Sequence, residues 1–180
     1  MKMAFLSALA VLTWQTAQAD HKGGDMNAIS VSSVAFGSMQ AIPPKFTCNG
    51  ENVSPPLSWK GIPERSKSIV LLCDDPDAPG GTWVHWVCYD IPASVDSLGE
   101  GVPAGYALPC GGKQGSNDFH STGYGGPCPP SGTHRYFFKV YCLDVVLNLP
   151  AGKTKRDIER AMSGHVLATG VLVGTYAQKR

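Results

Sequence analysis

The sequence lacks the features that mark several common protein classes. Its longest apolar run stands at the N-terminus and is too short to span a bilayer, and it has no block of like charges and no low-complexity tract. The 15 Lys and Arg residues against 14 Asp and Glu give a net charge of +1, so there is no basic stripe for nucleic acid or anionic lipid. We therefore expect no nucleic-acid partner and no integral membrane segment in the mature chain, and any ligand must be bound locally.

Glycine and proline, by contrast, are abundant. The chain holds 21 Gly and 14 Pro among 180 residues, with no period and no internal repeat. At 43% hydrophobic residues it is long enough to bury a core of its own. The composition favours one turn-rich β domain over a helical bundle.

The first 19 residues have the three parts of a secretory signal. Lys2 supplies the positive charge, residues 4–12 form the apolar segment, and residues 17–19 (Ala-Gln-Ala) form a small-residue cleavage site. We predict a signal peptide over 1–19, a linker over 20–27 and the folded domain over 28–180. The mature protein would then be periplasmic or secreted. The alternative is translation from Met26, which would leave the protein in the cytoplasm.

Four segments have the composition of β-strands. A continuous apolar run, typical of a strand buried on both faces, covers 68–73 and stops at Asp74. Runs rich in aromatic and β-branched residues cover 83–91 and 135–147, and a further strand is expected over 166–176. The pattern predicts a mainly β fold, an antiparallel two-sheet sandwich with one or two peripheral helices.

One segment has the signals of a helix. Thr154 and Asp157 have the spacing of a capping box, apolar residues follow at helical intervals, and Gly164 is the stop. Two loops stand out as well. Residues 99–133 form a connection much longer than usual, and 75–79 form a short one that two prolines stiffen.

His85 lies in the strand 83–91. Strand alternation predicts one face with Trp83, His85, Val87 and Tyr89 and another with Val84, Trp86 and Cys88. A lone histidine on an apolar face is usually a structural core residue. However, Asp75 and Asp77 stand just upstream, and a carboxylate bound to one imidazole nitrogen would leave the other nitrogen for a ligand.

A second constellation covers 123–136. Its glycines, Gly125 and Gly126 among them, can turn backbone N–H groups toward an anion, its prolines stiffen the loop, and His134 follows at the mouth of the next strand. From the residues alone, a plain surface loop is an equal interpretation.

Six cysteines are present, and none forms a C-x-x-C pair. Three lie in strand-like runs, where a thiol acts as a small buried hydrophobe. Cys48 and Cys128 lie in polar, Gly- and Pro-rich loops, and in an exported protein we expect these two to form a disulfide. We expect no metal ion and no cofactor.

Taken together, two groups of motifs resemble the phosphatidylethanolamine-binding protein family, also called the Raf kinase inhibitor-like family, and its bacterial branch in particular. The first is Asp75-Pro-Asp-Ala-Pro79 with Trp83-Val-His85. The second is Tyr124-Gly-Gly-Pro-Cys-Pro-Pro130 with Gly132-Thr-His-Arg-Tyr136. Shorter matches, such as Asn117-Asp-Phe119, extend the resemblance over about residues 28 to 176.

The resemblance implies a small pocket for phosphate-like anions or phosphorylated head groups. By position, the residues that would line or support it are Asp75, Asp77, Trp83, His85, His134 and Tyr136, with Pro79 shaping it. It also implies a cis bond between Ala78 and Pro79. Two imidazoles, the amides of 123–126 and the Tyr136 hydroxyl would donate to one anion. We expect the two aspartates to orient His85 or to meet a cationic amine beside the phosphate.

The expected function is therefore that of a non-enzymatic binding protein for a small phosphorylated or anionic ligand. One alternative is an inhibitor or regulator of a kinase or serine protease that acts through the same pocket on a protein partner not identified by the sequence. A hydrolase is a weaker alternative, because G-x-S-x-G and H-E-x-x-H are both missing and Gly152-Lys-Thr154 does not complete a P-loop.

Overall fold

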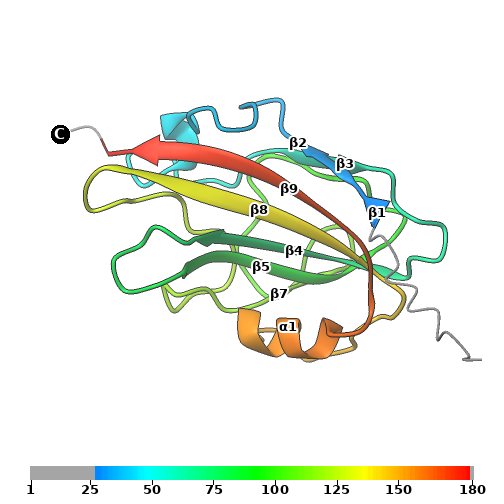
Figure 1. Cartoon of the computed structure of the whole chain (residues 1–180). Coiled ribbons are helices and arrows are strands. Elements are labelled where there is room, and N and C mark those ends of the chain that lie inside the picture. The colour runs from blue at the N-terminus through cyan, green and yellow to red at the C-terminus, as the bar shows by residue number, and fades with distance from the viewer. Residues whose placement is uncertain (1–26, 179–180) are drawn as a thin grey trace, which may run out of the picture.

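The four segments with strand composition form the centre of one sheet. A computed structural model describes residues 27–178; the expected signal peptide and the alternative start at Met26 lie outside this range (Figure 1). The large sheet has the order β1-β9-β8-β4-β5-β7. Its strands are β1 (Asn27–Ala28), β4 (Ser68–Asp75), β5 (Trp83–Pro92), β7 (Lys113–Gln114), β8 (Thr133–Leu143) and β9 (Val166–Ala177). All its pairs are antiparallel except β1 with β9.

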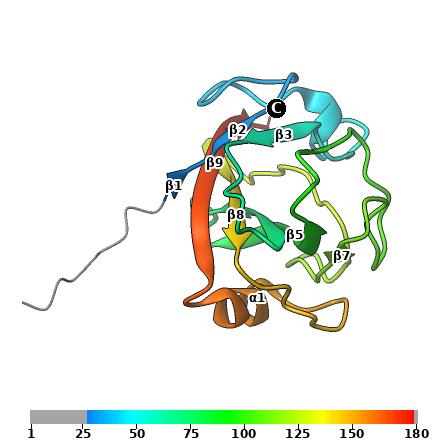
Figure 2. The same cartoon turned by 90° about the vertical axis from the view of Figure 1, so that its right-hand side faces the viewer.

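A second, smaller sheet packs on one face of the large one. It has the order β2-β3-β6, with β2 (Ser30–Ser32), β3 (Leu57–Lys60) and β6 (Ser97–Leu98), and a short 3-10 helix η1 (Pro44–Phe46) lies on the connection between β2 and β3. In two perpendicular views the small sheet and the helix α1 (Lys155–Met162) lie on opposite sides of the large sheet (Figures 1 and 2). The predicted two-sheet sandwich with a peripheral helix is confirmed.

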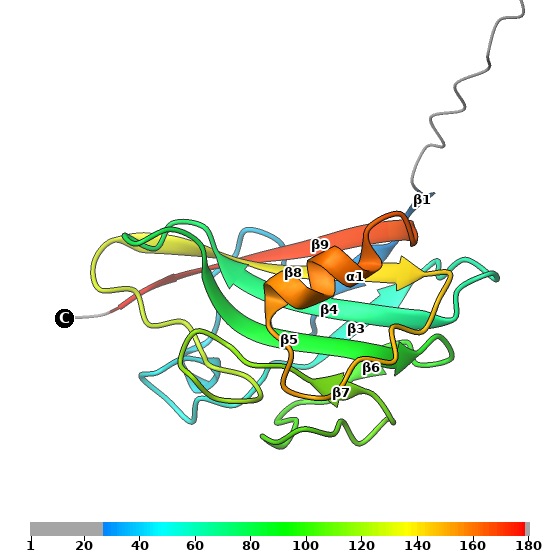
Figure 3. The same cartoon turned by 90° about the horizontal axis from the view of Figure 1, so that it is seen from below.

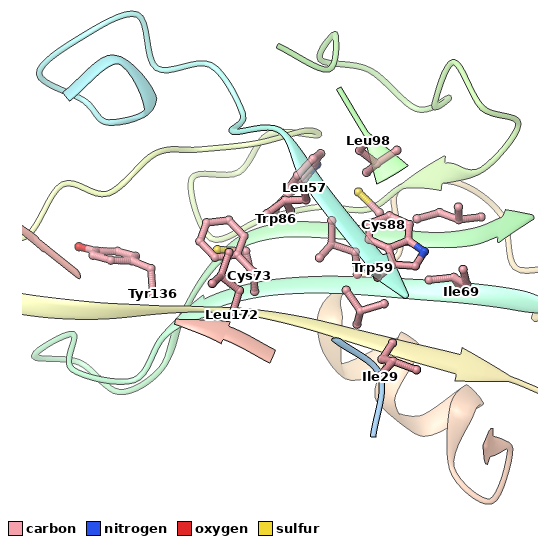
Figure 4. Close-up of a cluster of buried hydrophobic side chains, with 14 of the residues drawn as sticks. Ile29, Leu57, Trp59, Ile69, Cys73, Trp86, Cys88, Leu98, Tyr136 and Leu172 are labelled. Atoms are coloured by element: carbon pink, nitrogen blue, oxygen red, sulfur yellow. The ribbon is translucent and has the colours of Figure 1, made fainter. Parts of the chain in front are cut away.

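Apolar side chains pack on both faces of the large sheet, and β4 is therefore buried along its whole length. Between the two sheets lies a cluster of buried apolar side chains that includes Trp59, Trp86 and Leu172 (Figure 4). On the other face α1 lies across β4 and β5 (Figure 3). Its Ile158 and Met162 belong to a second buried cluster with residues of these two strands. Burial of these apolar side chains is the main stabilising contribution.

The expected capping box begins α1. The Thr154 hydroxyl accepts from the Asp157 backbone N–H at 3.3 Å, and the Asp157 carboxylate accepts from the Thr154 N–H at 3.1 Å. Both bonds satisfy N–H groups that a helix start leaves free. The predicted helix is therefore confirmed.

Two expected strand ends are wrong. The strand expected over 68–73 continues through Asp74 and Asp75, because the buried Asp74 carboxylate is paired with Lys139 at 2.8 Å. The strand expected over 135–147 ends at Leu143, because the next backbone N–H, that of Asp144, donates to the His165 carbonyl outside the ladder.

Candidate functional site

A cavity of about 210 Å³ lies where β4, β5 and β8 meet the long loop. We call it the imidazole cavity. It is lined by Asp75, Ala78, Pro79, Trp83, His85, Phe119, Cys128, Pro129, Pro130 and His134. It therefore brings together five residues that the sequence nominated, namely Asp75, Pro79, Trp83, His85 and His134.

A β-bulge aims His85 into this cavity. Cys73 pairs with Trp86 and Asp74 pairs with Val84, so His85 is an extra residue on β5. Bulges of this kind re-aim side chains. The expected alternation is wrong for this reason: Val84 packs with Val87 and Tyr89 under α1. The His85 ring instead lies edge-on to Tyr136, at 5.1 Å between ring centroids.

A backbone carbonyl, and no aspartate, orients His85. The Nδ1–H of His85 donates to the Gly125 carbonyl at 2.6 Å, and the Gly125 N–H donates back to the His85 carbonyl at 2.9 Å. Because a carbonyl oxygen only accepts, Nδ1 carries the proton and Nε2 remains free. Burial lowers the pKa of His85 below 6.5, so the ring is neutral at pH 7.

His134 is oriented by Asp75. Its Nδ1 lies 2.7 Å from the Asp75 carboxylate, and both side chains are buried. The other carboxylate oxygen of Asp75 accepts the Asp77 backbone N–H at 2.8 Å. The expectation that the aspartates orient His85 is therefore wrong: the register of β4 and β8 places Asp75 beside the other imidazole.

Asp77 points to a cation outside the cavity. Its carboxylate accepts two bonds from the Arg135 guanidinium, at 2.8 and 2.9 Å, and a third from the Arg135 backbone N–H at 3.0 Å. These side-chain bonds lower the pKa of Asp77 to about 2. The expected contact of Asp77 with a ligand amine is not supported, because its oxygens are already paired with Arg135.

The amides of Gly125 and Gly126 are not available to an anion. The Gly125 N–H donates to His85, and the Gly126 N–H donates to the Asn52 side chain at 2.7 Å. These glycines serve close packing instead: a Cβ at Gly125 would lie 2.5 Å from the Phe119 ring. The expectation that these two amides donate to an anion is wrong, because they already donate to acceptors within the protein.

Tyr136 supports the site from behind. It is fully buried and is absent from the cavity lining, and its hydroxyl has no hydrogen-bond partner among residues 27–178. Burial, and then the nearby Asp75 carboxylate, raise the pKa of Tyr136. The expected role as an anion donor is therefore not supported by its position in this structure.

The expected cis bond before Pro79 is also wrong. No peptide bond among the described residues is cis. The Gly81 N–H donates to the Ala78 carbonyl at 3.1 Å, which closes a four-residue turn with Pro79 in its second position. Turns of that kind take a trans proline there, whereas a cis proline occupies the third position.

Phe119 lines the cavity, although the sequence did not predict it as a site residue. The buried Asn117 side chain fastens its loop, accepting from the Phe119 and Ser121 backbone N–H groups and donating to the Gly123 carbonyl. The Phe119 ring lies edge-on to Trp83 at 5.4 Å, and the two rings are 42% and 39% exposed. They form an aromatic rim. The motif Asn117-Asp-Phe119, with its turn-forming residues, was the available signal.

Cys48 and Cys128 form a disulfide in the structure. Both residues are exposed, and Cys128 lines the imidazole cavity between two prolines. The remaining four cysteines are free, three of them buried.

A larger, more open groove of about 760 Å³ lies at the start of α1. Three of its charged groups are engaged by the protein itself. Lys155 pairs with Asp74 and Glu159. Asp118 accepts the Val84 N–H. The smaller cavity, with two oriented imidazoles, is therefore the candidate site.

Comparison with known proteins shows the family of this chain. The family model for phosphatidylethanolamine-binding protein matches residues 32–177. This chain belongs to the phosphatidylethanolamine-binding protein family. Family membership supports a role as a binding protein. No helix within 27–178 is long and apolar enough to cross a membrane.

The matches to three relatives span nearly the full length of each of them. A UPF0098 protein of Methanothermobacter thermautotrophicus is 51% identical over 148 residues, which cover 82% of this chain and 98% of that protein. Among solved structures, a homologue of the same family from Chlamydia trachomatis has a TM-score of 0.79 and 41% identity, covering 85% and 99% of the two chains. YbcL of Escherichia coli, described as a member of the mammalian phosphatidylethanolamine-binding protein family, has a TM-score of 0.77 and 32% identity. The match covers 84% of this chain and 99% of YbcL.

Proposed function

We propose that this family member is a non-enzymatic binding protein that takes a phosphate-like anion, or a phosphorylated head group, in the imidazole cavity. One observation carries the proposal. Two buried histidines from separate strands line one small cavity, and each is held through Nδ1. The Nε2 atom of each ring is then the nitrogen left to meet a ligand.

The cavity size limits the ligand. Its volume of about 210 Å³ is below the roughly 300 to 1,000 Å³ of sites that enclose drug-sized molecules. A phosphate group with a short substituent fits that limit, whereas a long chain on the same group would extend past the aromatic rim. Trp83 and Phe119 would contact the organic part there, and a cationic amine would be attracted to their ring faces.

The charge of the cavity predicts weak, proton-linked binding. No lysine or arginine of the described residues 27–178 lines it, and the pKa of His85 lies below its usual value. An anion therefore binds best to a protonated imidazole, which donates from both nitrogens. Charge-assisted bonds contribute about 1.5 to 3 kcal/mol each, and desolvation and ordering offset much of this.

The lining also argues against a nucleophilic enzyme. The thiol chemistry of Cys128 is blocked by the disulfide, and in the part of the chain that the structure describes no serine, threonine or lysine lines the cavity. The structure therefore offers no side chain there that a histidine could activate for covalent catalysis.

Calorimetric titration with phosphorylethanolamine and with inorganic phosphate tests the proposal. We expect the wild-type protein to bind both and His85→Ala to lose most of the affinity. His165→Ala is the matched control, because His165 pairs with Asp144 away from the cavity and is half exposed. Equal binding by wild type and His85→Ala would refute the site. Turnover of ester or phosphoester substrates that depends on His85 would indicate an enzyme instead.

A further inference from the structure

We propose that the Cys48–Cys128 disulfide is a thiol-exchange site that controls anion binding, so that the imidazole cavity is competent when the bond is oxidised and weakened when it is reduced. The inference rests on the proposed function of the cavity. It concerns the segment 128–132, which we call the wall segment, because Cys128, Pro129 and Pro130 form one side of the cavity.

Hydrogen bonds do not hold the wall segment. Just before it, the Pro127 carbonyl accepts from the Cys48 N–H at 3.1 Å, and just after it, Thr133 pairs with Ala177 in the β8–β9 ladder. Between these points, residues 128–132 make no hydrogen bond to any other part of the described chain. Two of the five residues are prolines, which have no N–H to donate.

The partner side of the disulfide is firmly anchored. The Cys48 N–H bonds to Pro127. Its neighbour Asn49 accepts from the Tyr176 hydroxyl at 2.8 Å, and the Tyr124 hydroxyl donates to the Phe46 carbonyl at 2.9 Å. The disulfide therefore connects a fixed loop to a segment that has no other bonded attachment along its length.

The two histidines do not depend on the disulfide. His85 is held by Gly125 and His134 by Asp75, both outside the wall segment. Reduction should leave the imidazoles in place but release the prolines opposite them. A released wall must be ordered again when the anion binds, and that ordering lowers affinity.

The bond is also accessible, because both of its cysteines are exposed. A protein or small-molecule dithiol would supply the two electrons. One of its thiolates attacks the Cys48 sulfur, a mixed disulfide forms, the Cys48–Cys128 bond breaks, and Cys128 leaves as a thiolate that takes up a proton. The second thiol then attacks the mixed disulfide and releases the Cys48 thiol, so the dithiol becomes a disulfide and the protein gains two thiols.

The test measures the Kd for inorganic phosphate by calorimetry before and after treatment with a small dithiol, and again after reoxidation. The dithiol changes one bond only, since the other four cysteines are already thiols. We expect reduction to raise Kd roughly three- to tenfold and reoxidation to restore it. Circular dichroism should show the fold retained on reduction.

A paired variant supplies the control. Cys48→Ser/Cys128→Ser should match the reduced wild type and should not respond to the dithiol. If the oxidised protein binds phosphate and reduction leaves Kd unchanged or lower, the redox control is wrong and the anion site stands. If neither form binds phosphate, the proposed function fails, and the redox control fails with it.

Discussion

Anion binding should weaken as the pH rises, because His85 must take up a proton to donate to the ligand. The His85 ring is buried, and burial lowers its pKa below 6.5 in the free protein. At pH 7 its Nε2 is therefore an acceptor, and it cannot bond a fully ionised oxyanion until it is protonated. Sulfate is the suitable probe because it does not itself titrate between pH 5 and 8.

The sign and size follow from proton linkage. Below the free-protein pKa of His85 the ring is already charged, so the Kd of sulfate should not depend on this group. Above that pKa, and until the higher pKa of the complex is passed, one proton is taken up on binding. Each unit of pH then raises Kd by up to about tenfold, equivalent to about 1.4 kcal/mol. At low pH, a variant that lacks the His85 imidazole loses this charge-assisted bond, and its binding free energy for sulfate should be weaker by about 1.5 to 3 kcal/mol.

Titration calorimetry in two buffers with different ionisation enthalpies counts the protons directly. The side-chain amide in His85→Gln can donate to the anion without taking up a proton. The slope of log Kd against pH should therefore be smaller in this variant than in the wild type, by about one. Any slope that remains in this variant belongs to other groups. His165→Gln should retain the wild-type slope. Identical slopes in wild type and His85→Gln, or no proton uptake, would contradict the assignment.

Three further predictions concern stability. The disulfide closes a loop with a sequence separation of 80, so Cys48→Ser/Cys128→Ser should lose about 2 to 4 kcal/mol of unfolding free energy in urea titrations. The oxidised wild type should show four reactive thiols once unfolded, and a count of six would contradict the bond. Gly126→Ala should cost about 1 to 3 kcal/mol because its Cβ would lie 2.5 and 2.6 Å from two oxygens, whereas Gly80→Ala, with open space around it, should leave the urea midpoint nearly unchanged. Thr154→Ala should cost about 1 kcal/mol, and an unchanged midpoint would refute the contribution of the capping box.

Several elements were predictable from the sequence because their causes are local. The capping box, the apolar spacing after it and the glycine stop all lie within the helix segment, so they specify α1 without reference to the rest of the chain. The composition of β4, β5, β8 and β9 likewise reports burial strand by strand. The two groups of loop motifs indicated the family, and with it the histidines that line one cavity.

The partners of those residues were decided only by the tertiary structure. Asp75 meets His134, 59 positions away in sequence, because the antiparallel register of β4 and β8 brings them together. A single extra residue in β5 turns His85 toward the cavity, and an alternating pattern cannot reveal it. The amides of Gly125 and Gly126 looked free in the sequence because their acceptors come from distant segments. Local patterns determined which chemical groups are present, and long-range pairing determined which of them remain free for a ligand.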